Sequence, residues 1–169
     1  MQPNPYIVGS SILFAVPMSI AANHRHWNIY AVFLYITIVS SIYHATKYQP
    51  LLLLDYPGCY AVVAVLGYER YKIQQFNQAL LYYSMCAVIF WGGYMTNRLA
   101  YSPDPVEQTV THVIMHLIVI LSASHTSYEM RRLACAEVNF QAGLSGGMGN
   151  SPQSVAAMEP TRQTARRKI

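Results

Sequence analysis

Charged residues are scarce in this chain of 169 residues. Asp, Glu, Lys and Arg make up 11% of it and hydrophobic residues 53%, whereas a soluble domain usually carries about 25% charged residues. This deficit excludes an ordinary soluble domain. The length corresponds to one domain, and the composition predicts an all-α integral membrane helix bundle. The basic residues are not interleaved with aromatic residues in a nucleic-acid-binding pattern, so we expect no nucleic acid partner.

Cysteine is rare as well, and its spacing forms no metal or disulfide motif. The three cysteines, Cys59, Cys86 and Cys135, include no CxxC pair, and their odd number gives no disulfide framework. Cys59 and Cys86 fall in apolar runs, where we expect buried thiols. The N-terminal sequence MQPNPYIVGS lacks the basic stretch of a cleavable signal peptide. We therefore expect internal membrane segments to direct the chain to its membrane.

Apolar residues, by contrast, are gathered into five runs long enough to cross a bilayer. A helix needs ~20 mostly apolar residues to span the hydrocarbon core. The runs cover residues 7–22, 27–45, 51–68, 79–97 and 105–124. Pro17 interrupts the first run and Pro57 lies inside the third, which membrane helices tolerate where neighbours satisfy the freed carbonyl. The sequence predicts about five transmembrane helices, with membrane lipids as direct partners.

The fifth run has a clear helix start. In the sequence SPDPVEQ, Asp104 is suited to the N-cap and Pro105 to the first helical position. Glu107 stands three residues after the cap, where a glutamate completes a capping box. We therefore expect the last membrane helix to begin at Pro105.

The composition changes after Ser127. We expect residues 1–127 to form the transmembrane bundle, and residues 128–169 to form an amphipathic segment followed by a low-complexity basic tail. A Gly/Ser/Pro-rich basic tail rarely packs a core of its own. We therefore expect partner protein subunits to contact this C-terminal tail.

The basic residues are distributed unevenly between the two ends of the predicted helices. With five crossings, Lys47 and Arg98 fall on the side of the N-terminus, and the other nine of the eleven fall on the opposite side. Because Lys and Arg accumulate on the cytoplasmic side, we expect the C-terminus to face the cytosol or the matrix. The home membrane is then that of the endoplasmic reticulum or Golgi, or the mitochondrial inner membrane.

Four ionisable residues fall at one depth of the predicted bundle. His44, Asp55, His112 and His116 come from three different runs, yet all lie in the leaflet on the N-terminal side. An ionisable residue inside a membrane span is by default a functional-site hypothesis. His125 lies deeper and half a turn from His116, so we exclude it. His24 and His26 lie in a link and are expected to be solvated.

The spacing of these residues points to metal chemistry. His112 and His116 are four residues apart and share one helix face, as do Ser40 and His44. Three converging imidazoles are the ligand set of an open zinc site, which keeps a fourth position for water. Asp55 could orient a ligand or take a proton from that water. Ser40 could hydrogen-bond the water or a developing oxyanion.

Two other interpretations stay open for the same residues. Membrane histidines and serines often form hydrogen bonds between helices, worth ~0.6 kcal/mol on average, and an Asp–His network can exist without a metal. A single haem does not fit an i,i+4 histidine pair, because its two axial ligands come from opposite faces of the ring.

The ordered set Ser40, His44, Asp55, His112 and His116 resembles the CREST superfamily of membrane zinc hydrolases. The segments SSIYHATK and LLLLDYPGCYAVV are most similar to its alkaline ceramidase and myomaker-like branches. The resemblance covers the motif helices, under half the chain. It implies that the three histidines bind zinc, that Asp55 acts as the base and that Ser40 steadies the oxyanion during cleavage of a lipid amide.

The number of predicted helices differs from that of the superfamily, and this difference leads to two functional hypotheses. Members have seven helices, and this sequence predicts five; the two that are missing would lie between the third helix and the HxxxH helix. The first hypothesis is a zinc-dependent amidase of the ceramidase type. The second is a non-catalytic accessory subunit of a large membrane complex, for example a respiratory-chain complex, that keeps the ancestral metal site.

Overall fold

The structure, a computed structural model, describes residues 4–146 and is helical throughout that range, with no strand among them. Five helical segments in it are long and apolar enough to cross a membrane. They are Pro5–Asn23, Trp27–Thr46, Gln49–Lys72, Phe76–Thr96 and Pro105–Ala142. The expected all-α architecture and the count of five are thus confirmed.

The first span consists of two short helices, α1 (Pro5–Ile12) and α2 (Ala15–Asn23). The sequence places the interruption at Pro17, but the break comes one turn earlier. A proline ring clashes with the carbonyl four residues before it, which here belongs to Leu13. That carbonyl accepts instead from the Val16 N–H at 3.0 Å, so the first α-helix ends ahead of the proline.

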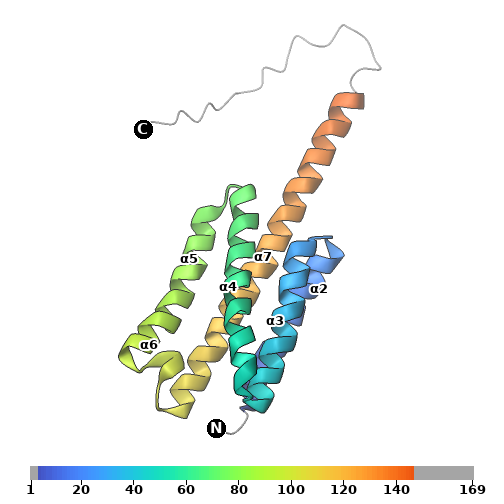
Figure 1. The fold of residues 1–169 in the computed structure, drawn as a ribbon. Helices are drawn as coiled ribbons and strands as arrows, with labels where there is room; N and C mark the ends of the chain where they lie inside the picture. Colours follow the sequence, from blue (N-terminus) through green and yellow to red (C-terminus); the bar gives the residue numbers. More distant parts are fainter. Residues whose placement is uncertain (1–3, 147–169) are drawn as a thin grey trace, which may run out of the picture. The chain divides into compact units, whose positions relative to one another are not determined.

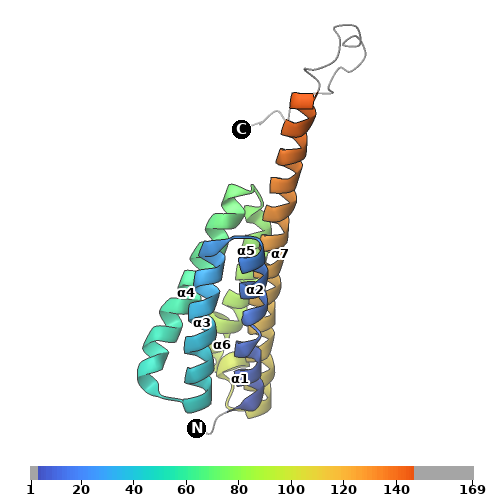
Figure 2. The same cartoon turned by 90° about the vertical axis from the view of Figure 1, so that its right-hand side faces the viewer.

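Helix α3 (Trp27–Thr46) is the central helix of the bundle and packs against α1, α2 and α4. Figures 1 and 2 show α3 lying between these neighbours. The helix ends at Lys47, whose backbone is left-handed with φ 55°. Glycine or asparagine is the usual residue in this conformation, so a lysine here is an exception.

Helix α4 (Gln49–Lys72) approaches α3 closely around Gly58. A Cβ at Gly58 would lie 2.7 Å from Cδ1 of Ile36 and 2.8 Å from Cε1 of Tyr35. The Tyr35 hydroxyl donates to the Leu54 carbonyl at 2.9 Å, three residues before Pro57. Pro57 itself lies inside this continuous helix.

The fourth span is the least regular of the five. Helix α5 (Phe76–Ala87) runs into a π-helical turn, Val88–Gly92, and then into α6 (Gly93–Thr96). A short 3-10 turn, Leu99–Tyr101, follows. Helix α5 packs against α4, and most of its surface is left uncovered by the rest of the chain.

Helix α7 (Pro105–Gly146) begins as expected. Oδ1 of Asp104 accepts from the Val106 N–H at 2.9 Å, which confirms the N-cap. The expected capping box is wrong, because the Asp104 N–H donates to the Ser102 hydroxyl oxygen. Glu107 reaches further back instead, and its carboxylate accepts from the Leu99 N–H at 3.1 Å and from Ser102 at 2.5 Å.

Helix α7 continues without interruption past Ser127, where the sequence indicates a change of composition. The chain divides into two compact units, Met1–Leu133 and Ala134–Ile169. In the second unit, residues 134–142 are helical and exposed. The predicted basic tail beyond residue 146, and its contacts with partner subunits, lie outside the described residues.

The core of the first unit is a layer of apolar side chains from α2, α3, α4 and α7. Its most enclosed members are Ala21, Ile29, Phe33, Leu66 and Ala123. The expectation of a buried thiol at Cys59 is wrong: this residue lies on the outer surface of α4, while Cys86 is half-buried. Cys59 faces outward because the buried face of α4 carries Gly58, Val62 and Leu66 instead.

Candidate metal centre

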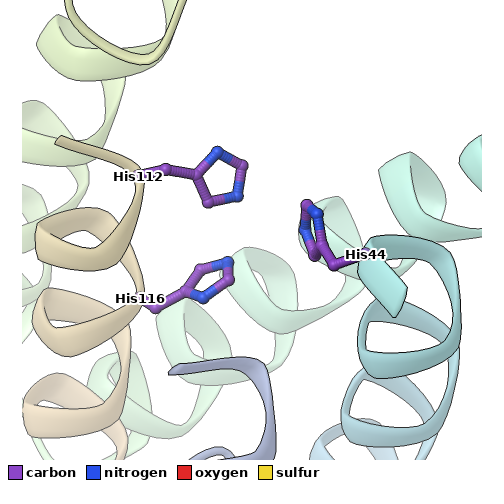
Figure 3. A group of neighbouring side chains, drawn as sticks. All are labelled: His44, His112 and His116. Carbon is purple, nitrogen blue, oxygen red and sulfur yellow. The ribbon is translucent and has the colours of Figure 1, made fainter. Parts of the chain in front are cut away.

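Three histidines meet at one end of the bundle, as their spacing predicts. His44 comes from the last turn of α3, and His112 and His116 come from successive turns of α7. One ring nitrogen from each lies within 4.8 Å of the other two. Figure 3 shows the three imidazoles turned toward one another. His44 and His116 are buried and His112 is half-buried, so this cluster could hold a metal ion.

The three histidine rings lie close together. In a tetrahedral site with zinc–nitrogen distances of about 2.0–2.1 Å, two ligand nitrogens are about 3.3 Å apart. The ring centroids of His112 and His116 are 4.7 Å apart, and those of His44 and His112 are 4.9 Å apart. The three rings are thus near enough to one another for a single ion to lie between them.

A hydrogen bond from α1 sets the tautomer of His116. The Ser10 hydroxyl donates to the Ile7 carbonyl at 2.9 Å, which uses its single proton. Nδ1 of His116 lies 2.9 Å from the Ser10 oxygen, so the ring must be the donor. With the proton on Nδ1, the lone pair of Nε2 is free for a metal. Metal-binding histidines usually have such a partner on the other nitrogen.

Nε2 of His44 is buried and has no hydrogen-bond partner within the described part of the chain. An unpaired buried polar atom is costly, and a metal ion would satisfy it. On the other side of the ring, Nζ of Lys47 lies 3.4 Å from Nδ1. Burial lowers the pKa of this ammonium group, and the charge of Asp55 acts in the opposite direction.

The two predicted catalytic residues lie beside each other, on neighbouring helices. Ser40 is buried on α3, one turn before His44, and its side chain interacts with that of Asp55 on α4. Oδ1 of Asp55 is buried and has no hydrogen-bond partner among the described residues. The Ser40 oxygen is also 3.3 Å from that of Ser11, whose hydroxyl donates to Ile7.

Sequence reasoning did not include the two serines of α1. Ser10 and Ser11 are almost fully buried, although they stand in an apolar run. The only local signal is the GSS triplet at residues 9–11. Their role depends on α1 lying against α3 and α7, which no periodicity in the run indicates.

A second polar cluster lies at the other end of the bundle, around Arg70. The sequence suggests that this residue belongs to an interfacial link, but its side chain is fully buried. Nε donates to Thr126 at 2.8 Å, and Nη1 donates to Gln75 and Gln78, each at 2.8 Å. Nη2 lies 3.0 Å from Nδ1 of His125. His125 is thus well separated from the three-histidine cluster, in line with its exclusion.

The neighbouring link residue His26 is half-buried rather than solvated as expected. Burial lowers the pKa of its ring, and a hydrogen bond to the backbone of Ser127 acts in the opposite direction. The link between α2 and α3 therefore contacts α7.

Comparison with known proteins identifies no relative of this chain. No family model, no curated protein and no solved structure matches the chain.

Proposed function

We propose that this chain is a membrane-embedded zinc protein of the ceramidase type, with a lipid amide as its substrate. The observation that carries the proposal is the convergence of His44, His112 and His116, with a hydrogen bond that leaves Nε2 of His116 free. Three imidazoles and an open fourth position are the usual ligand set of catalytic zinc. The resemblance to the CREST superfamily supports the same assignment.

Zinc bound by these three histidines would lower the pKa of a water molecule and polarise the substrate carbonyl. The chain itself would supply the remaining groups. Asp55 has a buried oxygen with no partner, which suits it to accept a proton. Ser40 hydrogen-bonds Asp55, and its hydroxyl would turn from that carboxylate to donate to an oxyanion. Ser10 would keep the ring of His116 in its metal-binding tautomer.

Elemental analysis of the purified chain tests the metal. We expect about one zinc per chain, and loss of that zinc in the His112→Ala/His116→Ala variant. The His125→Ala variant is the matched control, because it removes a histidine from the same helix but from the other cluster. Equal zinc content in all three proteins would exclude the three-histidine site.

Hydrolysis of a long-chain ceramide in detergent tests the reaction. General base catalysis typically contributes 10²–10⁴-fold to a rate, so we expect Asp55→Asn to lower turnover by about that factor while zinc content stays unchanged. A zinc-loaded sample that releases no fatty acid from ceramide or other amide lipids would overturn the enzymatic part of the proposal.

A second candidate, an accessory subunit of a larger membrane complex, is favoured by the fourth span. Only 11% of the apolar window of Phe76–Thr96 is buried within the chain, compared with 39% for Trp27–Thr46. A partner subunit would cover this face and the segment 134–142. Native mass spectrometry after mild extraction from the source membrane distinguishes the cases, because a monomer with no co-purifying subunit contradicts this candidate.

The orientation belongs to the same proposal. We place the C-terminus in the cytosol or the matrix, because nine of the eleven basic residues lie on that side of the five spans. The home membrane is an organellar one, of the endoplasmic reticulum, the Golgi or the mitochondrion. Protease accessibility of a C-terminal epitope in sealed organelles tests the orientation.

A further inference from the structure

Helix α1 is attached to the rest of the bundle mainly through polar side chains. Its N-cap residue donates from Nδ2 to the Thr109 hydroxyl of α7 at 2.6 Å. Ser10 accepts from His116 of α7 at 2.9 Å, and the Ser11 oxygen lies 3.3 Å from that of Ser40 in α3. Figure 2 shows α1 lying along the first turns of α7. Because a single neutral hydrogen bond contributes little net stability, these three contacts hold α1 weakly.

The apolar core, in contrast, receives side chains from α2 rather than from α1. Phe14, directly before α2, and Ala21, within it, belong to the core layer, and Met18 packs against that layer. Among the described residues of α1, Ile7 is the one buried apolar side chain, and it is not a member of the layer. Helices in a bilayer are held together by packing and by interhelical hydrogen bonds. If α1 moved away, the bundle would therefore lose little packing.

The junction between α1 and α2 is suited to act as a hinge. Pro17 has no N–H, so the Leu13 carbonyl lacks its usual helical partner and accepts from Val16 instead. The Phe14 N–H likewise bonds three residues back, to the Ser11 carbonyl at 3.2 Å. The α-helical hydrogen-bond ladder is thus interrupted over one turn. Hinges are usually a few residues at the ends of such elements.

We propose that α1 is a gate that swings about the Leu13–Phe14 junction and so uncovers His116 and Ser40. In the structure His116 is 5% exposed and Ser40 is 2% exposed, and both contact α1. The outer face of α1 is apolar, with Tyr6 and Ile12 more than half exposed. Opening would therefore connect the histidine cluster with the hydrocarbon phase. It would give a lipid substrate a lateral entrance, and this use of the gate rests on the proposed function.

Chemical labelling of the histidines measures the opening. Diethyl pyrocarbonate modifies accessible imidazoles, and mass spectrometry gives the rate at each histidine of the full chain in neutral nanodiscs, after treatment with a chelator. A buried group is labelled in proportion to the population in which it is uncovered. In Thr109→Val the bond to Asn4 is lost, while Oδ1 of Asn4 still caps α1. We expect labelling of His116 to rise about fivefold, the worth of one neutral hydrogen bond.

The matched control, Thr111→Val, separates a moving gate from a loosened α7. It makes the same substitution one turn closer to His116, at a hydroxyl that bonds to carbonyls of α7 itself. We expect this variant to label His116 at the rate of the unchanged chain. Ser11→Ala removes a second contact of α1. In the double variant Thr109→Val/Ser11→Ala the two increases should multiply, because one opening breaks both contacts.

The inference is overturned if Thr109→Val labels His116 no faster than the unchanged chain. It is overturned as well if Thr111→Val accelerates the labelling equally, or if the double variant is no faster than the faster single variant. The measurement uses neither zinc nor substrate, so its result is independent of the proposed function. A gate in a chain that binds no zinc supports the inference while the amidase proposal fails, and an active amidase with a fixed α1 shows the reverse.

Discussion

At the scale of single residues, the buried serines of α1 have specific hydrogen-bonding tasks. Ser10 donates to a carbonyl of its own helix and accepts from His116 on another. Both its proton and one lone pair are used inside the bundle, so its burial leaves no unpaired donor. A hydrogen-bond partner on the far nitrogen of a metal-binding histidine fixes the orientation of the ring and raises its basicity.

Replacing Ser10 by alanine should therefore weaken metal binding without removing a ligand. Loss of such a partner typically costs 10–100-fold in metal affinity, and we expect a decrease in that range for zinc, measured by competition with a chromophoric chelator. Ser19→Ala is the control, because the Ser19 hydroxyl bonds only to the Ala15 carbonyl on the exposed side of α2. Equal affinities for the two variants would contradict the tautomer assignment.

The histidine cluster could be predicted from the sequence, whereas the residues that hydrogen-bond to its histidines could not. A four-residue spacing places His112 and His116 on one face, and the depth of His44 in its run places it at the same level. These are properties of single helices. The contact of Ser10 with His116 depends on how α1 crosses α7, which is a tertiary property. For the same reason, the sequence places Lys47 only in a link between two spans and does not predict its contact with His44.

At the scale of elements, the packing of α3 against α4 depends on the missing side chain of Gly58. The neighbouring carbons of Ile36 and Tyr35 stand closer to an added Cβ than real Cβ contacts allow. These two helices hold His44 and Ser40 on one side and Asp55 on the other. The close approach therefore brings Asp55 of α4 beside Ser40 of α3.

A Gly58→Ala substitution should destabilise the bundle by about 1–3 kcal/mol, the usual cost of overpacking. The expected readout is a lower midpoint of thermal unfolding in detergent. Gly9→Ala provides the comparison, because an added Cβ there meets nothing within 4 Å, and alanine favours a helix over glycine. A Gly58→Ala protein as stable as the Gly9→Ala protein would contradict the predicted overpacking and would show that the Ile36 and Tyr35 side chains move aside.

The link between α2 and α3 should give the protein an acid-sensitive stability. Burial has the largest effect on the pKa of His26 and lowers it. The backbone hydrogen bond to Ser127 and the charge of Glu69 raise this pKa, while His24 and Lys72 lower it. A group with a lowered pKa in the folded state binds fewer protons there than in the unfolded state. Stability is therefore lost as the pH falls below the unfolded value of about 6.5.

The measurement is chemical unfolding in detergent at pH 8, 7, 6 and 5. We expect the loss of stability between pH 7 and pH 5 to be smaller in His26→Gln than in the unchanged chain. A pH profile that is identical in the two proteins would contradict a buried, neutral His26.

The existence and approximate length of each helix could be predicted from hydropathy, but the details of the helix ends could not always be predicted. All five spans were predicted, because each needs a long apolar run. The capping box at Glu107 was predicted from local spacing alone. Its carboxylate is instead occupied by the Leu99 N–H and the Ser102 hydroxyl, because the preceding 3-10 turn folds back over the start of α7. Such competition between nearby donors is not visible in a motif.

At the scale of the whole bundle, Arg70 connects three helices at the end opposite the histidines. Its guanidinium belongs to α4 and binds side chains of α7 and of the start of α5. Nearly all of its donors meet neutral acceptors, so the charge is dispersed over a hydrogen-bond network. Glu129 completes the network, through Gln75 at 3.2 Å and Arg132 at 2.9 Å.

Removing this side chain should be costly. In Arg70→Ala, the buried hydroxyl of Thr126 and the half-buried acceptors on Gln75 and His125 lose their donor. A buried group left unpaired costs about 1–3 kcal/mol. We therefore expect a loss of at least about 2 kcal/mol in the free energy of unfolding. Arg98→Ala should change stability by less than about 1 kcal/mol, because its ion pair with Glu107 is largely exposed.

Between the two polar ends lies the apolar layer of Ile29, Phe33, Leu66 and Ala123. A hydrophobic constriction of this kind excludes water and hydrated ions. In a bundle that spans a membrane, this layer would separate the histidines from water at the Arg70 end. Proton exchange at the histidines would then open no path for ions from one end of the bundle to the other.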